Sequence, residues 1–289
     1  MLLETTKFTS MKSGPHLVVF GAIHGDEVCG PRAIRGIIAD LEAGNLTLAS
    51  GSVTFVPICN PEAHAAGKRS IDENLNRVFC VTDSPQSYEA RLANELCPLM
   101  TGADVFLDIH SQNAPGPVSL FTDYPEDPRN RALAAALPSK YVLLGWPAIY
   151  EETEHDFGSY STNRCAHENG AAEVLIECGQ NEDPEAAVVA REVILRTLAH
   201  LNMIDPLPAL SSDAETVNIR MKRVYAHEHP DDRFEKEWEH LELVSKGTCI
   251  AVRATGERIV VDCDSIVIFP KVTATPGEEW FYLGEVEPN

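Results

Sequence analysis

The chain has 289 residues, of which 44% are hydrophobic, so it can bury a core large enough for one substantial domain with or without a small appendage. Its net charge of −21, from 23 basic and 44 acidic residues, disfavours binding to nucleic acid and to anionic membranes. No apolar run approaches the ~18 residues that span a bilayer, and residues 1–8 lack the apolar core of a signal peptide. The eight cysteines form no C-x-x-C pair. We therefore expect a cytoplasmic protein with reduced, mostly buried cysteines.

The first predicted elements are a buried strand, a helix and a second buried strand. Residues 18–20 form an apolar run that stops at Gly21. Apolar side chains then recur at helical spacing from Gly30 to about Gly44. Residues 52–58 form the second apolar run. A strand, a helix and a strand in so short a stretch predict a right-handed parallel unit.

A polar segment comes next, followed by further strands and helices. Residues 62–79 predict a long polar loop, and long irregular loops inside a compact domain are usually either functional or disordered. Residues 103–110 predict a third strand, which ends in a histidine. The remaining predicted elements are strands at 117–122, 140–144 and 173–179 and helices at 88–100, 129–137, 157–169 and 184–201.

The composition shifts near residue 205. From residue 217 onward the chain has short alternating segments, separated by turn signals such as Lys246-Gly247, which are typical of a small antiparallel β module. The expected fold class is therefore α/β, with an α/β domain over residues 1–204 and a small C-terminal antiparallel β domain over residues 205–289.

Three potential metal ligands follow predicted strands. His24 and Glu27 come just after the first strand, and His110 ends the third. Ligands of open α/β sheets gather at the carboxyl ends of strands, so these side chains are expected to meet. Two imidazoles and a carboxylate are the ligand set of a catalytic zinc ion with one open position. The alternative is that the His24 motif arose by chance and that His110 is an ordinary core histidine.

Glu177 ends another apolar strand of the predicted sheet. Placed over the metal site, its carboxylate would act as a general base and then return the proton to a leaving amine. Its alternative role is to cap the loop before the helix at residue 184.

The segment 69–77 offers two guanidiniums and amide side chains. Near a metal site, one arginine can stabilise an oxyanion and another can bind a substrate carboxylate through two parallel hydrogen bonds. On an ordinary surface, the same arginines would be solvated charges.

Five segments together carry a resemblance to a known family. They are residues 21–27 (GAIHGDE), 60–63 (NPEA), 69–79 (RSIDENLNRVF), 108–110 (DIH) and 176–179 (IECG). In order and spacing they resemble the succinylglutamate desuccinylase and aspartoacylase family, and the similarity extends over essentially the whole chain.

The resemblance implies a mixed, largely parallel sheet with helices on both faces, like that of zinc carboxypeptidases, and hydrolysis of the amide bond of a small N-acyl amino acid. It implies one zinc ion per chain on His24, Glu27 and His110, with Glu177 as base and acid. It also implies that Arg69 polarises the scissile carbonyl.

The resemblance assigns four more residues to the substrate. Asn76 and Arg77 would hold a substrate carboxylate, and Tyr160 with Arg164, four residues apart on a predicted helix, would bind the carboxylate of an amino acid side chain. The chain departs from the family at Asn74, where many members have an aspartate that orients a zinc-bound histidine.

Two other functions compete with N-acyl amino acid hydrolysis. A zinc carboxypeptidase acting on short peptides would use the same metal chemistry in an open cleft. A non-catalytic binding module is suggested by the C-terminal turns, which resemble those of carrier-type β folds. The expected partner is a small-molecule substrate, and the sequence is compatible with a homo-oligomer.

Overall fold

The computed structural model describes residues 3–153, 155, 157–158, 160–210 and 216–287. Within these residues the central feature is an 11-stranded sheet with the order β1-β3-β2-β4-β7-β5-β6-β8-β14-β13-β10. Its strands are β1 (Thr6–Thr9), β2 (His16–Gly21), β3 (Ser52–Val56), β4 (Val105–Gln112), β5 (Ser119–Thr122), β6 (Tyr141–Leu144), β7 (Ala172–Gln180), β8 (Val217–Ala226), β10 (Glu242–Val244), β13 (Ser265–Ile268) and β14 (Glu279–Val286).

The sheet is mixed, and its middle is largely parallel. The strands β3, β2, β4 and β7 pair in parallel, as do β5 with β6 and β6 with β8. Antiparallel pairing occurs between β5 and β7, at the β1 edge and among the C-terminal strands. This arrangement confirms the predicted fold class.

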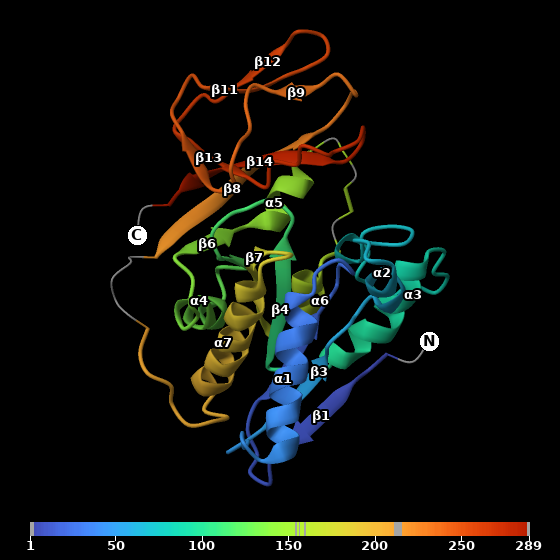
Figure 1. Cartoon of the computed structure of the whole chain (residues 1–289), viewed down its shortest axis with the longest axis vertical. Helices are drawn as coiled ribbons and strands as arrows, with labels where there is room; N and C mark the ends of the chain where they lie inside the picture. The colour runs from blue at the N-terminus through green and yellow to red at the C-terminus, as the bar shows by residue number, and fades with distance from the viewer. Residues whose placement is uncertain (1–2, 154, 156, 159, 211–215, 288–289) are drawn as a thin grey trace.

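Helices cover both faces of the sheet (Figure 1). One core layer contains α1 (Cys29–Ala43), α4 (Pro128–Ala135) and α7 (Pro184–His200), and the other contains α3 (Tyr88–Leu96) and α6 (Thr162–Glu168). Because successive strand residues point to opposite faces, Val19 and Leu107 pack in the first layer while Val18 and Phe106 pack in the second. His110 follows the parity of Phe106 and therefore lies on the α3 and α6 face.

Four short helices complete this part of the chain. They are α2 (Pro61–Ala66), α5 (Trp146–Glu151) and the 3₁₀ turns η1 (Leu75–Arg77) and η2 (Cys97–Met100). The sequence predicted only a loop where α2 and η1 lie. The Asn60 side chain accepts a hydrogen bond from Ala63 N–H (3.4 Å) and Pro61 occupies the first turn, so the polar stretch begins as a capped helix.

The predicted helix over residues 157–169 was wrong in its first part. The helix α6 begins at Thr162, where the Ser161 side chain caps it by accepting a hydrogen bond from Arg164 N–H (3.0 Å). Tyr160 precedes the cap and forms a parallel bridge with Val78. Tyr160 and Arg164 are therefore not on one face of a common helix.

The C-terminal strands extend the large sheet and add a small one. Because β8 pairs in parallel with β6, the large sheet continues past residue 205. A separate antiparallel sheet consists of β9 (Arg233–Phe234), β11 (Cys249–Val252) and β12 (Arg258–Val260), seen at the top of Figure 1. The predicted C-terminal antiparallel module is confirmed, whereas the division between residues 204 and 205 stays a prediction.

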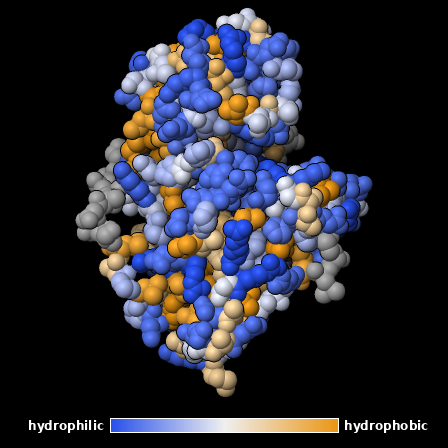
Figure 2. Space-filling model, in the orientation of Figure 1, coloured by the Kyte–Doolittle hydropathy of each residue, from blue (hydrophilic) through white to orange (hydrophobic). Residues whose placement is uncertain are grey.

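The surface is predominantly polar on the face shown in Figure 2, where hydrophilic residues spread over both the α/β layers and the C-terminal strands. Within the described part of the chain, no helix combines the length and apolarity required to cross a membrane. All eight cysteines are free thiols, and only Cys80 and Cys263 are partly exposed.

Candidate active site

His24 and Glu27 lie in the loop between β2 and α1. The loop turns tightly, with Glu27 N–H donating to His24 O (3.2 Å). Gly25 packs directly on α2, and a Cβ atom at this position would lie 2.3 Å from the backbone of Ala63 and His64. Glycine is therefore required for the loop to approach α2 this closely.

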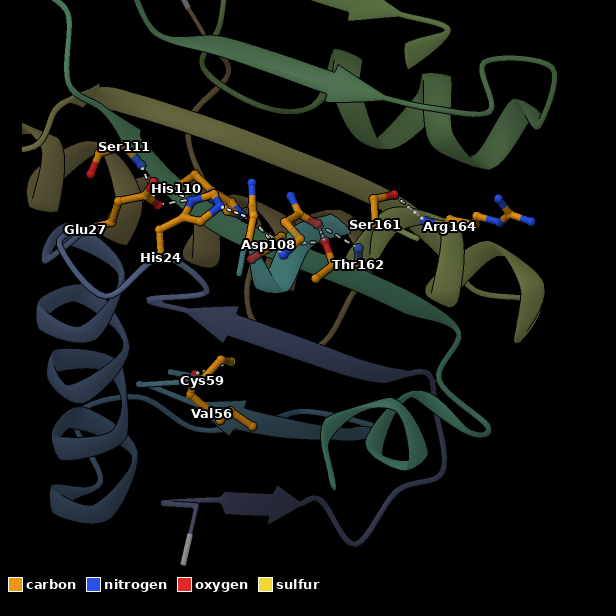
Figure 3. Close-up of polar contacts among 12 residues, drawn as sticks. His24, Glu27, Val56, Cys59, Asp108, His110, Ser111, Ser161, Thr162 and Arg164 are labelled. Atoms are coloured by element: carbon orange, nitrogen blue, oxygen red, sulfur yellow. Dashed lines mark hydrogen bonds and ion pairs between the residues drawn. The ribbon is translucent and has the colours of Figure 1, made fainter. Parts of the chain in front are cut away.

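The three predicted metal ligands meet in one buried cluster (Figure 3). Glu27 bridges the two histidines, since its Oε1 lies 2.7 Å from His24 Nδ1 and its Oε2 lies 2.9 Å from His110 Nδ1. One ligand atom from each residue lies within 4.8 Å of the others, and each residue is at most 4% exposed. The strand-end rule thus correctly predicted that these residues, far apart in the chain, meet.

The second nitrogen of each imidazole also faces an oxygen. His24 Nε2 is hydrogen-bonded to Asn74 Oδ1 (3.0 Å), whereas His110 Nε2 lies 3.0 Å from Asp108 Oδ2 without completing a hydrogen bond. Thr162 Oγ1 in turn lies 2.6 Å from Asp108 Oδ2. Partners of this kind fix the ring orientation of metal-binding histidines, and they leave both Nδ1 atoms directed toward Glu27.

Counting donors and acceptors shows that the cluster fits a cation. Asn74 Oδ1 also accepts from Asn76 N–H (2.9 Å), so it is an oxygen to which His24 must donate its Nε2–H. A neutral imidazole has a single N–H, so His24 Nδ1 presents a lone pair to the Glu27 carboxylate. A metal ion would turn these two facing acceptors into two ligands, and two nitrogens with one carboxylate suit zinc.

The protonation of the cluster reflects its burial and close charges. Burial and then Arg69 lower the pKa of His24 to about 4. Burial acts to raise the pKa of Glu27, but His24 and His110 outweigh it and hold the pKa below its ordinary value. Burial likewise acts to lower the pKa of His110, but Asp108 and Glu27 outweigh it and raise the pKa well above 6.5.

Glu177 lies beside the cluster. It is the register partner of His110 in the β4–β7 pair, so both side chains project from the same face of the sheet. Its Oε2 is buried and has no hydrogen-bond partner among the described residues. Burial, and next the nearby Glu27 carboxylate, raise the pKa of Glu177 to about 8. A half-buried glutamate with an uncommitted, buried oxygen beside the three ligands is placed for proton transfer.

Arg69 reaches the cluster from the segment after α2. Its Nη1 lies 3.5 Å from Glu27 Oε1, and its side chain is 41% exposed, so this contact alone is weak. The guanidinium is therefore near the cluster and still accessible from solvent.

Asn76 and Arg77 are already engaged by protein groups. Asn76 Oδ1 accepts from Thr162 N–H (2.9 Å), which joins the η1 turn to the start of α6. Arg77 Nε donates to Glu279 Oε1 (2.8 Å) and Arg77 Nη1 donates to Asn76 O (2.9 Å). Burial acts to lower the pKa of Arg77, but Glu279 and Tyr150 outweigh it and raise the pKa well above its ordinary value.

Tyr160 and Arg164 lie apart from the ligand cluster. Arg164 Nε donates to Glu168 Oε1 (2.9 Å), and its guanidinium carbon lies 4.3 Å from the centre of the Tyr160 ring. In Figure 3 the Arg164 side chain extends away from His24 and Glu27. The structure thus groups these two residues with each other and not with the three ligands.

Two residues of β14 were missed by the sequence analysis. Besides its bond to Arg77, Glu279 accepts a hydrogen bond from Tyr150 Oη (2.6 Å), and Tyr150 Oη lies 2.9 Å from Tyr282 Oη. The C-terminal strand therefore supplies a carboxylate and a phenol to the wall around Arg77. The only signal in the sequence is a glutamate at the start of the otherwise apolar run 280–283.

A sequence model described as the succinylglutamate desuccinylase/aspartoacylase catalytic domain matches residues 13–201. The chain belongs to this family. Members similar to it include the rat N-acyl-aromatic-L-amino acid amidohydrolase (carboxylate-forming), which is 33% identical over 128 residues, and the succinylglutamate desuccinylase of Vibrio vulnificus, which is 32% identical over 95 residues. These matches cover 39% and 33% of this chain, respectively.

The matched region spans less than half of these curated relatives, namely 39% of the rat protein and 27% of the Vibrio protein. The family fold extends further. A succinylglutamate desuccinylase/aspartoacylase structure from Rhodobacter sphaeroides superposes with a TM-score of 0.77 at 22% identity, covering 99% of this chain and 90% of that one.

Proposed function

We propose that this family member is a zinc-dependent amidohydrolase that cleaves the amide bond of a small N-acyl amino acid. The observation that carries the proposal is the convergence of His24, Glu27 and His110 next to Glu177. When bound by the three ligands, zinc supplies a Lewis acid that polarises a carbonyl and lowers the pKa of water.

In the proposed reaction Glu177 acts in its ionised form, which a cation held by the three ligands would favour by lowering the raised pKa of this carboxyl group. It takes a proton from the attacking water as the water oxygen bonds to the acyl carbon. The C–N bond then breaks as Glu177 passes that proton to the amine nitrogen, and the acyl group is released as a carboxylic acid, which becomes a carboxylate by losing its remaining proton to solvent. Arg69 stabilises the negative charge that develops on the carbonyl oxygen, for which its accessible guanidinium is suited.

The substrate's amino acid part is assigned to four residues. Arg77, held in place by Glu279, and Asn76 bind a carboxylate. Tyr160 and Arg164 bind a side-chain carboxylate, for which Arg164 would have to leave Glu168. Separating Arg164 from Glu168 costs little, because a partly exposed ion pair four residues apart on a helix contributes only about 0.3–0.5 kcal/mol. Cytoplasmic location and homo-oligomer formation stay predictions.

The test is metal analysis followed by a turnover panel. Purified protein is expected to hold about one zinc ion per chain. The panel contains N-acetylaspartate, N-succinylglutamate, N-acetylphenylalanine and short peptides, so that it also distinguishes a carboxypeptidase. Glu177→Gln is expected to lower kcat on the order of 10²-fold or more, whereas Glu182→Gln, an exposed glutamate after β7, is expected to leave it unchanged. Turnover of peptides alone, or of no compound in the panel, would reject the proposal.

A further inference from the structure

Glu89 is a fully buried glutamate that has no part in the reaction proposed above. It lies in the first turn of α3 and is 0% exposed. Charged side chains are seldom fully buried unless they are paired or extensively hydrogen-bonded, so its surroundings require an explanation.

The Glu89 carboxylate is surrounded by donors from one short segment. Its Oε1 accepts from Ile71 N–H (2.7 Å), and its Oε2 accepts from Asp72 N–H (3.1 Å) and Glu73 N–H (3.2 Å). The side chain of Asn60 donates a fourth hydrogen bond to Oε1 (3.2 Å). Three successive backbone N–H groups directed at one anion form a nest, which here is filled by the protein's own carboxylate.

A return hydrogen bond locks the segment to the helix. Asp72 Oδ2 accepts from Tyr88 N–H (2.7 Å) at the start of α3. The segment and the helix terminus therefore bind each other in both directions. The two acceptors differ in burial, since Glu89 is 0% exposed whereas Asp72 is exposed, which makes the hydrogen bonds to Glu89 the stronger constraint.

The segment held by Glu89 has a site residue at each end. At one end, Arg69 O accepts from Gly25 N–H (3.0 Å), and its guanidinium approaches Glu27. At the other end, Asn74 Oδ1 accepts a hydrogen bond from His24 Nε2 (3.0 Å). The nest lies between these residues in the chain, so the position of both depends on the same backbone.

We propose that Glu89 is a positioning residue: its carboxylate fixes the backbone of residues 71–73 and so places Arg69 at the carbonyl site and Asn74 at His24. The catalytic consequence rests on the proposed function, whereas the effects on the backbone and on metal binding do not. Glu89 contacts neither the ligand cluster nor the substrate site and acts only through the segment that it holds.

The test compares Glu89→Gln with Glu95→Gln, an exposed glutamate on the same helix. Glutamine keeps the shape but replaces one acceptor oxygen with a donor nitrogen that opposes the backbone N–H groups. Amide hydrogen exchange at Ile71, Asp72 and Glu73 is expected to accelerate at least tenfold, and zinc affinity is expected to fall at least threefold. Glu95→Gln is expected to change neither quantity. Unchanged exchange and unchanged zinc affinity in folded Glu89→Gln would overturn the proposal.

A second comparison separates positioning from general support of the fold. In wild-type protein, Glu89→Gln is expected to lower kcat at least tenfold, with a smaller drop in an Arg69→Ala background because part of the effect is already lost. Equal drops in both backgrounds would mean that Glu89 does not act through Arg69, which would overturn that part of the proposal. If Glu89→Gln does not fold, Glu89→Asp, which keeps the charge on a shorter arm, is measured in its place with the same criteria.

The failure of this proposal is distinguishable from that of the proposed function. Hydrogen exchange and zinc affinity require no substrate, so they decide the role of Glu89 even if the wild-type protein hydrolyses none of the N-acyl amino acids. The absence of turnover in wild-type protein would reject the proposed function alone.

Discussion

The ion pair between Arg77 and Glu279 joins the α/β layers to the C-terminal strand β14, and its loss should be costly. The two side chains are 14% and 23% exposed, and Arg77 Nε lies 2.8 Å from Glu279 Oε1. Glu279→Gln removes the negative charge while preserving an oxygen for Tyr150 Oη. The variant therefore leaves the mostly buried Arg77 guanidinium without its ion-pair partner.

The expected magnitude follows from the burial of the pair. Breaking a buried ion pair on one side costs about 3–5 kcal/mol, and the partial exposure of Glu279 favours the lower end, about 3 kcal/mol. Arg220 and Glu287 form a matched control, because they are 2.7 Å apart but 30% and 37% exposed. Screening by solvent reduces the expected cost of Glu287→Gln to under about 1 kcal/mol.

The assay is urea unfolding at pH 7 of three single variants, Glu279→Gln, Glu287→Gln and Arg77→Met, and of the double variant Arg77→Met/Glu279→Gln. The double variant is expected to lose less unfolding free energy than the sum of Arg77→Met and Glu279→Gln, because it leaves no unpaired charge. A loss below about 1 kcal/mol in Glu279→Gln, or additive losses in the double variant, would refute the reasoning.

Three further predictions concern the site and its supports. Asn74→Ala is expected to weaken zinc binding about 10–100-fold in a calorimetric titration, because His24 loses its partner; Asn74→Asp, which retains an acceptor, should bind at least as tightly as wild type. Burial lowers the pKa of His240 to about 3. Between about pH 6.5 and pH 3, His240 is therefore protonated in the unfolded chain but neutral in the folded chain. Stability should therefore fall by several kcal/mol between about pH 6.5 and pH 3, with a shallower fall in His240→Asn; parallel pH profiles from thermal unfolding would contradict this. Gly25→Ala is expected to cost about 1–3 kcal/mol or more, because its Cβ would collide with the α2 backbone, and an unchanged melting temperature would argue against the close approach.

The ligand cluster was predictable because its position follows from sheet geometry. The strands β2 and β4 are parallel neighbours, so the residues after their carboxyl ends lie at the same edge of the sheet. The parity of side chains along β4 and β7 then places Glu177 on the same face as His110. The apolar runs locate the strands, and the polar residues at their carboxyl ends identify the side chains that meet at this edge of the sheet.

The wall around Arg77 was not predictable in the same way. Glu279 meets Arg77 only because β14 pairs antiparallel with β8, which itself pairs in parallel with β6. The order of strands in a mixed sheet is not encoded in any local pattern. The start of α6 was missed for a different reason, since Ser161 can cap a helix only where Tyr160 is held outside it by Val78. Both cases depend on contacts between segments far apart in the chain.

The most direct test of the central claim is the turnover of an N-acyl amino acid by zinc-loaded Glu177→Gln, measured beside wild type and Glu182→Gln. The account predicts about one zinc ion per chain in all three proteins and a fall in kcat on the order of 10²-fold or more in Glu177→Gln alone. Undiminished turnover in Glu177→Gln, or a wild-type protein that binds no zinc, would contradict it.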